Sequence, residues 1–202
     1  MEIKTFGVVG AGQMGNGIAQ VAAVSGLDVV MNDIKTEFVE SGLATITKIL
    51  ARSVDKGKMT ADEKDAVLDR IKPSTDLQDM SGVDFVVEAA TENENLKFQI
   101  FKDLDEICQP GVILATNTSS IPIGRISAQT RRPEQVIGMH FMNPVPVMKL
   151  VEVIPGIATS EETFKITWDL SEKFGKTPAK ANDFPGFIAN RILMPMINEA
   201  TY

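Results

Sequence analysis

Short apolar runs alternate along the chain with longer segments whose apolar residues recur every three or four positions. The run at residues 84–89 is too apolar to alternate, which is typical of a strand buried on both faces of a parallel sheet. On this pattern we expect strands at residues 6–9, 28–32, 71–75, 84–89, 111–117, 136–141, 149–155 and 177–182.

The longer segments predict helices at residues 14–25 and 34–54, a further one that begins at Thr60 and ends near residue 70, one capped by Ser160, and a last from about residue 187. Thr60 followed by Glu63 is typical of a capping box. The second and third helices would form a hairpin inserted after the second strand. Another helix would present one apolar face made of Leu96, Ile100, Leu104 and Ile107.

Alternation of strands and helices predicts an α/β fold with a doubly wound, mainly parallel sheet. In such sheets, ligands bind beyond the carboxyl ends of the strands. Polar residues that follow strands are therefore candidates for a functional site. Ser119, His140 and Asn143 all lie at such strand ends.

The first strand leads directly into the glycine pattern Gly10-x-Gly12-x-x-Gly15 and then into a helix. Gly10 allows a tight turn, Gly12 lets the backbone approach a pyrophosphate, and Gly15 lets the helix pack closely on the strand. The N–H groups and the dipole of the helix N-terminus then favour phosphate binding. This context predicts a Rossmann-type dinucleotide site.

Asp33 ends the second strand, 18 residues after Gly15. A carboxylate there can accept hydrogen bonds from an adenosine ribose, and it would repel a 2′-phosphate. Asp33 therefore favours NAD over NADP, although Lys35 lies nearby. The alternative is a glycine-rich turn without a ligand, in which Asp33 caps the following helix.

Composition narrows the classes of function. The 202 residues include 20 basic and 27 acidic ones, a net charge of −7, and no basic stripe, so we expect neither nucleic-acid nor membrane binding. Cys108 is the single cysteine, which fits a reducing, cytoplasmic location and a structural thiol. We expect no signal peptide, no membrane span and no metal site.

His140 is the only histidine, and imidazole can both take and return a proton near neutral pH. Glu152 lies within the apolar run of residues 150–154, where an unpaired carboxylate would be costly to bury. The sequence therefore leaves two readings for His140, a satisfied core histidine and a catalytic acid/base.

Five motifs occur in order, and together they resemble the L-3-hydroxyacyl-CoA dehydrogenases, most closely the bacterial 3-hydroxybutyryl-CoA dehydrogenases. The resemblance covers essentially the whole chain. The motifs are the glycine loop, Glu88-Ala89-Ala90-x-Glu92-Asn93, Asn117-Thr118-Ser119-Ser120, Gly138-x-His140-Phe141-x-Asn143-Pro144 and Asp183-x-Pro185-Gly186-Phe187-x-x-Asn190-Arg191.

The resemblance implies a reversible oxidation of a 3-hydroxyacyl-CoA, of short chain length, to the 3-oxoacyl-CoA, with hydride transfer to NAD. It makes His140 the acid/base, pairs Glu152 with it, and places Ser119 and Asn190 at the substrate oxygen and the nicotinamide. Ser119 could instead be a helix cap, and Lys97 a surface lysine. The residues that the resemblance assigns to the cofactor are Gly10, Gly12, Gln13, Met14, Gly15, Asp33, Ala90, Glu92, Lys97, Asn117, Ser119 and Asn143.

The resemblance also implies two domains, an NAD-binding domain at residues 1–184 and the first helix of a helical domain at residues 185–202. The family forms homodimers through that second domain, so we do not expect this chain to dimerise in the same way. The expected helical hairpin is the family's CoA site, and its basic residues form either a solvated face or a patch for a phosphorylated substrate tail. These residues are Lys48, Arg52, Lys56 and Lys58.

Two alternatives remain. One is a different Rossmann dehydrogenase that acts on free hydroxyacids through a catalytic lysine, against which the pair His140 and Glu152 speaks. The other is a protein on the same fold that binds NAD without turnover, either as a structural protein or as an inactive fragment.

Overall fold

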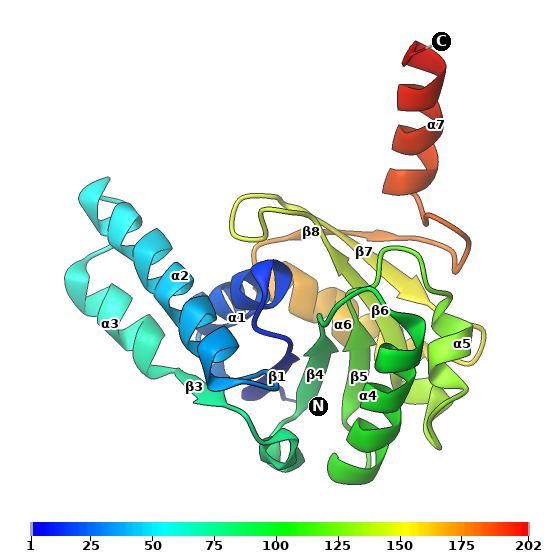
Figure 1. Ribbon diagram of the computed structural model, residues 1–202, viewed down its shortest axis with the longest axis horizontal. Coiled ribbons are helices and arrows are strands. Elements are labelled where there is room, and N and C mark those ends of the chain that lie inside the picture. The colour runs from blue at the N-terminus through cyan, green and yellow to red at the C-terminus, as the bar shows by residue number, and fades with distance from the viewer. Residues whose placement is uncertain (1, 202) are drawn as a thin grey trace.

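The computed structural model describes residues 2–201, so Met1 and Tyr202, the outer ends of the two predicted domains, lie outside the described residues. One sheet of eight strands runs through the molecule in the order β3-β2-β1-β4-β5-β6-β7-β8 (Figure 1). The strands are β1 (Thr5–Val9), β2 (Asp28–Asn32), β3 (Ile71–Ser74), β4 (Phe85–Glu88), β5 (Ile113–Thr116), β6 (Val136–Phe141), β7 (Leu150–Pro155) and β8 (Thr177–Lys180).

Helices cover both faces of this sheet, which confirms the predicted doubly wound α/β fold. The α-helices are α1 (Gln13–Val24), α2 (Thr36–Asp55), α3 (Ala61–Asp69), α4 (Glu94–Ile107), α5 (Ile123–Ser127), α6 (Glu161–Lys173) and α7 (Ala189–Thr201). Two 3₁₀ helices, η1 (Leu77–Gly82) and η2 (Pro133–Gln135), complete the list. The sequence did not predict α5, η1 or η2, because such short helices show no apolar periodicity.

The predicted hairpin is present, and Thr60 and Glu63 make both hydrogen bonds of the capping box at the start of α3. Neighbouring strands are parallel except for β6 and β7, which are antiparallel. This reversal pairs His140 directly with Glu152 across the two strands. Side chains directly opposite each other lie on the same face of a sheet, so the topology itself brings these two residues together.

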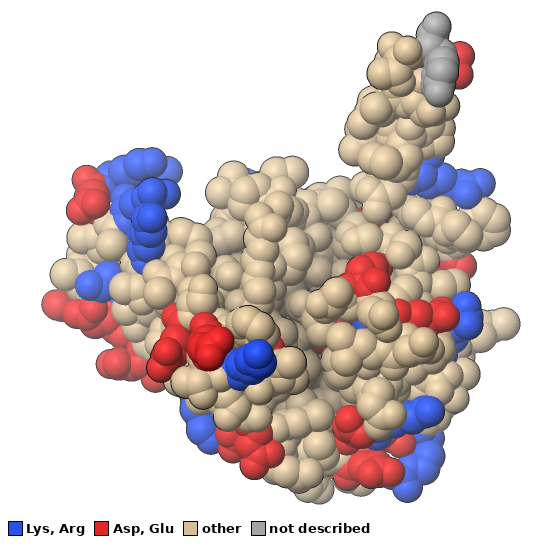
Figure 2. Space-filling view, in the orientation of Figure 1, with Lys and Arg blue, Asp and Glu red and all other residues tan. Residues whose placement is uncertain are grey.

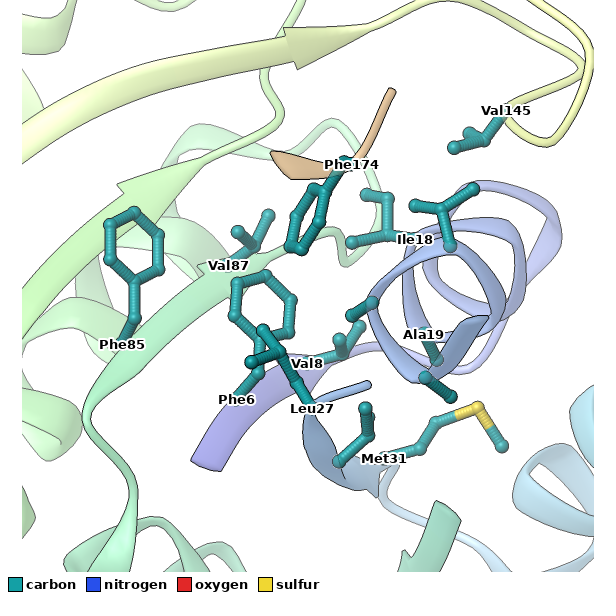
Figure 3. Packing of buried hydrophobic residues seen from close by; sticks show 14 of the residues in the cluster. Phe6, Val8, Ile18, Ala19, Leu27, Met31, Phe85, Val87, Val145 and Phe174 are labelled. Atoms are coloured by element: carbon teal, nitrogen blue, oxygen red, sulfur yellow. The ribbon is translucent and has the colours of Figure 1, made fainter. Parts of the chain in front are cut away.

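Two apolar layers lie on opposite faces of the sheet. In the layer under α1 and α6, Phe6 stacks on Phe85 with ring centroids 5.7 Å apart and meets the ring edge of Phe174 at 5.4 Å (Figure 3). Ile18 of α1 lies in the same layer. The other layer contains Phe101 and Leu104 of α4. Burial of these layers supplies the main free energy that holds the helices to the sheet.

The predicted apolar face of α4 is only partly correct. Leu104 is buried as expected, together with Phe101 and the whole side chain of Lys97. Leu96 is 42% exposed, and it lies with Ile100 at the wall of the cleft described below. Apolar spacing marked these positions correctly as a stripe, but part of the stripe faces the cleft.

Helix α7 projects away from the sheet, and none of its described residues is buried (Figure 1). Its apolar side chains are exposed, among them Ile192 at 63% and Met196 at 57%. Among residues 2–201, no helix combines the length and the apolar character needed to cross a bilayer.

Gly15 lies where α1 packs so closely on the preceding turn that there is no room for a side chain. A Cβ built at Gly15 would lie 1.7 Å from the carbonyl oxygen of Gly10, whereas a Cβ at Gly12 would have no heavy atom within 4 Å. The close approach of α1 to the first turn therefore requires glycine at position 15, as the sequence predicted.

We expect Gly15→Ala to destabilise the chain by about 1–3 kcal/mol, the usual range for overpacking, because backbone must move to admit the methyl group. Urea unfolding followed by circular dichroism measures this change. Gly12→Ala is the matched control and should leave the unfolding midpoint almost unchanged. Equal midpoints for the two variants would contradict the close packing at Gly15.

Candidate functional site

A cleft with a volume of about 880 Å³ opens at the carboxyl ends of β1, β2 and β4. Its walls come from the glycine loop, α2, α4 and the loop between β6 and β7. This is the position that a doubly wound sheet predicts for a ligand. The predicted site residues that line it are Gly10, Gly12, Gln13, Asp33, Ala90 and Asn143.

The glycine loop is shaped for a phosphate group. Gly10 has a φ of +102°, a left-handed conformation that favours glycine. Gly12 precedes α1 and carries no atom that would obstruct the cleft. A pyrophosphate can therefore approach the N-terminus of α1, where unpaired N–H groups and the helix dipole attract negative charge.

Asp33 ties the glycine loop to the end of β2. Its Oδ2 accepts a hydrogen bond from the N–H of Ala11 at 2.7 Å, and its Oδ1 accepts one from the N–H of Ile34 at 2.7 Å. The alternative reading that Asp33 caps the following helix is wrong, because α2 begins at Thr36 and its N-cap is Lys35. Asp33 also lines the cleft, and each carboxylate oxygen can accept more than one hydrogen bond.

His140 and Glu152 form a buried pair at the carboxyl end of β6. His140 Nδ1 lies 2.7 Å from Glu152 Oε2, and the two side chains are 7% and 1% exposed. The other carboxylate oxygen, Oε1, accepts hydrogen bonds from the backbone N–H groups of Ile188 and Ala189 at 2.9 and 2.8 Å. Glu152 therefore joins the histidine to the start of α7 and to the residue before it.

Burial alone would raise the pKa of Glu152, but the hydrogen bonds from His140, Ala189 and Ile188 outweigh it and hold the pKa below its usual range. Glu152 is therefore a carboxylate at neutral pH. Because a carboxylate can only accept, Nδ1 of His140 carries the hydrogen of this contact. In the neutral form of the ring, Nε2 then carries the lone pair that a general base needs.

The segment that leads into α7 also contacts the histidine. Phe187 is buried, and its ring centroid lies 5.8 Å from that of His140. Phe187 has a φ of +47°, which is unusual for a residue with a bulky side chain. Asn190 follows in the first turn of α7 and is half-buried. Asn190 thus directly follows three residues that contact the pair, namely Phe187, Ile188 and Ala189.

Ser119 follows β5, and Glu92 determines the course of its loop. Oε1 of Glu92 accepts hydrogen bonds from the N–H of Ser119 at 2.8 Å and from the hydroxyls of Thr118 at 2.5 Å and Ser120 at 3.0 Å. Burial raises the pKa of Glu92, but these donors and Lys97 together lower it below its ordinary value. An ionised Glu92 therefore fixes the loop that carries Ser119.

Lys97 is not the surface lysine that one reading predicted. Its side chain is 1% exposed, and its Nζ lies 2.6 Å from Glu88 Oε1, 3.2 Å from the carbonyl oxygen of Ala90 and 3.5 Å from Glu92 Oε2. Lys97 thus holds the segment after β4 against α4. Asn117 is also buried, and its Oδ1 accepts a hydrogen bond from the N–H of Phe141 at 2.9 Å.

Of the remaining predicted cofactor residues, Gly15 is buried behind the glycine loop and Met14 packs against the apolar layer of α1. Sequence reasoning did not single out the apolar wall of the cleft. Leu77, Leu96 and Ile100 line it together with Ile34, which is 81% exposed. The apolar stripe of α4 was the only sequence pattern that marked Leu96 and Ile100, and it did not indicate that they line a cleft.

Cys108 is structural, as predicted, because its thiol is buried and burial raises its pKa to about 11. No group of three His, Cys, Asp or Glu side chains among residues 2–201 could hold a metal ion.

Figure 2 shows basic side chains gathered at the tip of the hairpin of α2 and α3, and Lys48, Arg52, Lys56 and Lys58 of this hairpin are all exposed.

Known proteins match this chain over nearly its full length. The family described as "3-hydroxyacyl-CoA dehydrogenase, NAD binding domain" matches residues 5–184. A Bacillus subtilis (strain 168) protein named "Probable 3-hydroxybutyryl-CoA dehydrogenase" is 57% identical over 202 residues, 100% of this chain and 70% of that protein. The 3-hydroxybutyryl-CoA dehydrogenase of Bradyrhizobium diazoefficiens is 52% identical over 200 residues, 99% of this chain and 68% of that protein.

Solved structures show the same relationship. The crystal structure of (S)-3-hydroxybutyryl-CoA dehydrogenase from Ralstonia eutropha has a TM-score of 0.97 and 52% identity, over 98% of this chain and 70% of that one. The resemblance inferred from the five motifs is thereby confirmed. The chain belongs to the 3-hydroxyacyl-CoA dehydrogenase family, and residues 5–184 match its NAD-binding domain.

Proposed function

We propose that this chain interconverts a short-chain 3-hydroxyacyl-CoA, such as 3-hydroxybutanoyl-CoA, and the corresponding 3-oxoacyl-CoA, with NAD as the hydride carrier. The observation that carries the proposal is the buried pair of His140 and Glu152, 2.7 Å apart at the carboxyl end of β6. Relatives named as 3-hydroxybutyryl-CoA dehydrogenases support the substrate class. They do not favour the alternative of a non-catalytic protein.

The residues of the cleft fit NAD. The open space at Gly12, the N-terminus of α1 and the carboxylate of Asp33 suit a pyrophosphate and a ribose, and the apolar wall of Leu77, Leu96 and Ile100 suits an adenine. When bound, NAD accepts or donates the hydride. The protein then has to orient the substrate carbon and to manage one proton.

His140 manages that proton through Nε2. In the oxidation direction, Nε2 accepts the proton of the substrate hydroxyl as the C–H hydride leaves, and in the reduction direction it returns the proton to the carbonyl oxygen. Glu152 keeps Nδ1 protonated and stabilises the imidazolium. We assign Ser119 and Asn190 to the substrate oxygen and the nicotinamide, where they can donate hydrogen bonds. We assign Asn143, which lines the cleft, and Asn117 to the cofactor.

The proposal gives Glu92 and Lys97 a supporting role at the cofactor, since both are bonded to the loops after β4 and β5. The exposed basic tip of the hairpin suits the phosphates of CoA by charge. We assign residues up to 184 to the cofactor domain, and α7 to the start of a second domain. The cytoplasmic location remains a prediction.

We expect His140→Gln to lower turnover of acetoacetyl-CoA with NADH by about 10²–10⁴, the usual contribution of a general acid/base, while NADH affinity stays nearly unchanged. NADH absorbance measures turnover, and calorimetry measures affinity. Unchanged turnover would remove His140 from the mechanism, whereas loss of NADH binding would point to a structural role.

We expect Asp33→Asn to shift cofactor preference toward NADPH, because the variant loses the charge that repels a 2′-phosphate. A hydrogen bond to a charged group contributes about 1.5–3 kcal/mol, so NADH affinity should fall by about 10- to 100-fold. The ratio of NADPH to NADH affinity is the decisive measurement, with the exposed Glu37→Gln as control. A ratio equal to that of the original chain would exclude Asp33 from cofactor selection.

The lowered pKa of Glu152 predicts a pH-dependent stability. A depressed carboxyl pKa adds stability that is present above the ordinary value of 4.5 and is lost as pH falls through the folded-state pKa. Glu152→Gln should therefore lower the free energy of unfolding, relative to the original chain, by more at pH 5 than at pH 3. Urea unfolding at the two pH values measures this difference. Exposed Glu40→Gln should show little deficit at either pH. A deficit that grows toward pH 3 would contradict an ionised Glu152.

A further inference from the structure

The loop between β6 and β7 forms one wall of the cleft. Asn143, Pro144, Val145 and Pro146 all line the cleft from this side. Val145 is only 2% exposed and packs on α1, where a Cβ at Gly17 would lie 2.8 Å from Val145 Cβ. The position of this loop therefore determines the width of the cleft opposite the glycine loop.

Lys176 lies behind this loop and does not line the cleft. It follows α6 and directly precedes β8, and its side chain is buried at 9% exposure. Its Nζ donates hydrogen bonds to the carbonyl oxygen of Val145 and, at 2.9 Å, to that of Met148. One ammonium group thus connects two residues on opposite sides of the loop tip.

Backbone hydrogen bonds on both sides of Lys176 fix the position from which its side chain extends. The N–H of Lys176 donates to the carbonyl of Ser171 at 3.1 Å, and the N–H of Thr177 donates to the carbonyl of Lys149 at 2.8 Å. Inside the loop, the N–H groups of Val147 and Met148 both donate to the carbonyl of Pro144, at 3.0 and 2.9 Å. Lys176 therefore completes a set of bonds that defines one loop conformation.

Burying a lysine on neutral acceptors is costly. Both acceptors of Lys176 Nζ are backbone carbonyl oxygens, and burial lowers the pKa of Lys176. A methionine would fill a similar space without the desolvation cost of an ammonium group. Burial of Lys176 therefore lowers the stability of the fold. The loop that it holds contains Asn143, a predicted cofactor residue.

We propose that Lys176 is a positioning residue for the proposed dehydrogenase, which sets cofactor affinity by holding the loop of Asn143 to Met148 against the cleft. The inference rests on the proposed function in one respect, namely that Asn143 contacts the cofactor. It assigns to Lys176 no contact with cofactor or substrate. Its effect is transmitted through the carbonyls of Val145 and Met148.

The test compares Lys176→Met, which keeps the aliphatic stem, with Lys176→Arg, which restores donors, and with Lys173→Met on the exposed side of α6. We expect Lys176→Met to weaken NADH binding by about tenfold and to lower kcat/KM by about 10- to 100-fold. Lys176→Arg should recover most of both quantities, and Lys173→Met should match the original chain. If Lys176→Met does not fold, Lys176→Gln replaces it with the same expectations.

A double-mutant cycle with Asn143→Ala separates positioning from general stability. If Lys176 acts through the loop, its loss should cost little further NADH affinity once the Asn143 side chain is gone, so the two effects are not additive. Additive effects, or a lowered unfolding midpoint with unchanged NADH affinity, would overturn the proposal and leave Lys176 a structural residue.

Hydrogen exchange at the loop amides distinguishes this inference from the proposed function. Lys176→Met should accelerate exchange at Val147 and Met148, whose N–H groups close the loop on Pro144. Unchanged exchange together with unchanged NADH affinity would overturn the inference while turnover upholds the function. Failure of the original chain to bind NADH would refute the proposed function, and with it the cofactor role of Lys176, whatever the exchange shows.

Discussion

The carboxylate of Glu152 is the interaction on which the arrangement of the site depends. It is 1% exposed, and a hydrogen bond to a charged group contributes about 1.5–3 kcal/mol, so loss of a partner of this carboxylate is costly. One oxygen fixes the His140 ring, and the other holds the start of α7. The carboxylate of Glu152 therefore determines both the tautomer of His140 and the position at which α7 begins.

The reversal of strand direction at β7 makes this contact possible. A parallel neighbour would need a long crossover connection, whereas an antiparallel one needs only a short loop and places its residues directly opposite those of β6. The short loop then lies at the carboxyl end of β6, which is the same edge as the glycine loop. The antiparallel pairing of β6 with β7 thus places Glu152 beside His140 and also forms one wall of the cleft.

Much of this could be predicted from the sequence, because local patterns encode it. Apolar runs gave the strands, and a lone carboxylate in an apolar run required a partner such as His140. The face of Leu96 and Ile100 could not be predicted, since an apolar stripe looks the same whether it faces a core or a cleft. Lys97 and Lys176 were also beyond reach, because lysine is ordinarily exposed and only tertiary contacts reveal a buried one.

Both buried lysines donate hydrogen bonds to backbone carbonyl groups of loops that follow strands at the functional edge of the sheet. Where strands end, backbone carbonyls lose their ladder partners, and a buried carbonyl without a donor is unfavourable. An ammonium group offers three donors on a flexible stem and can reach carbonyls of different residues at once. Lys176 does this for Val145 and Met148 after β6. Lys97 donates to one carbonyl, that of Ala90 after β4, and its other partners are carboxylates. Buried lysines can therefore order cleft loops without entering the cleft, which leaves its surface to the ligand.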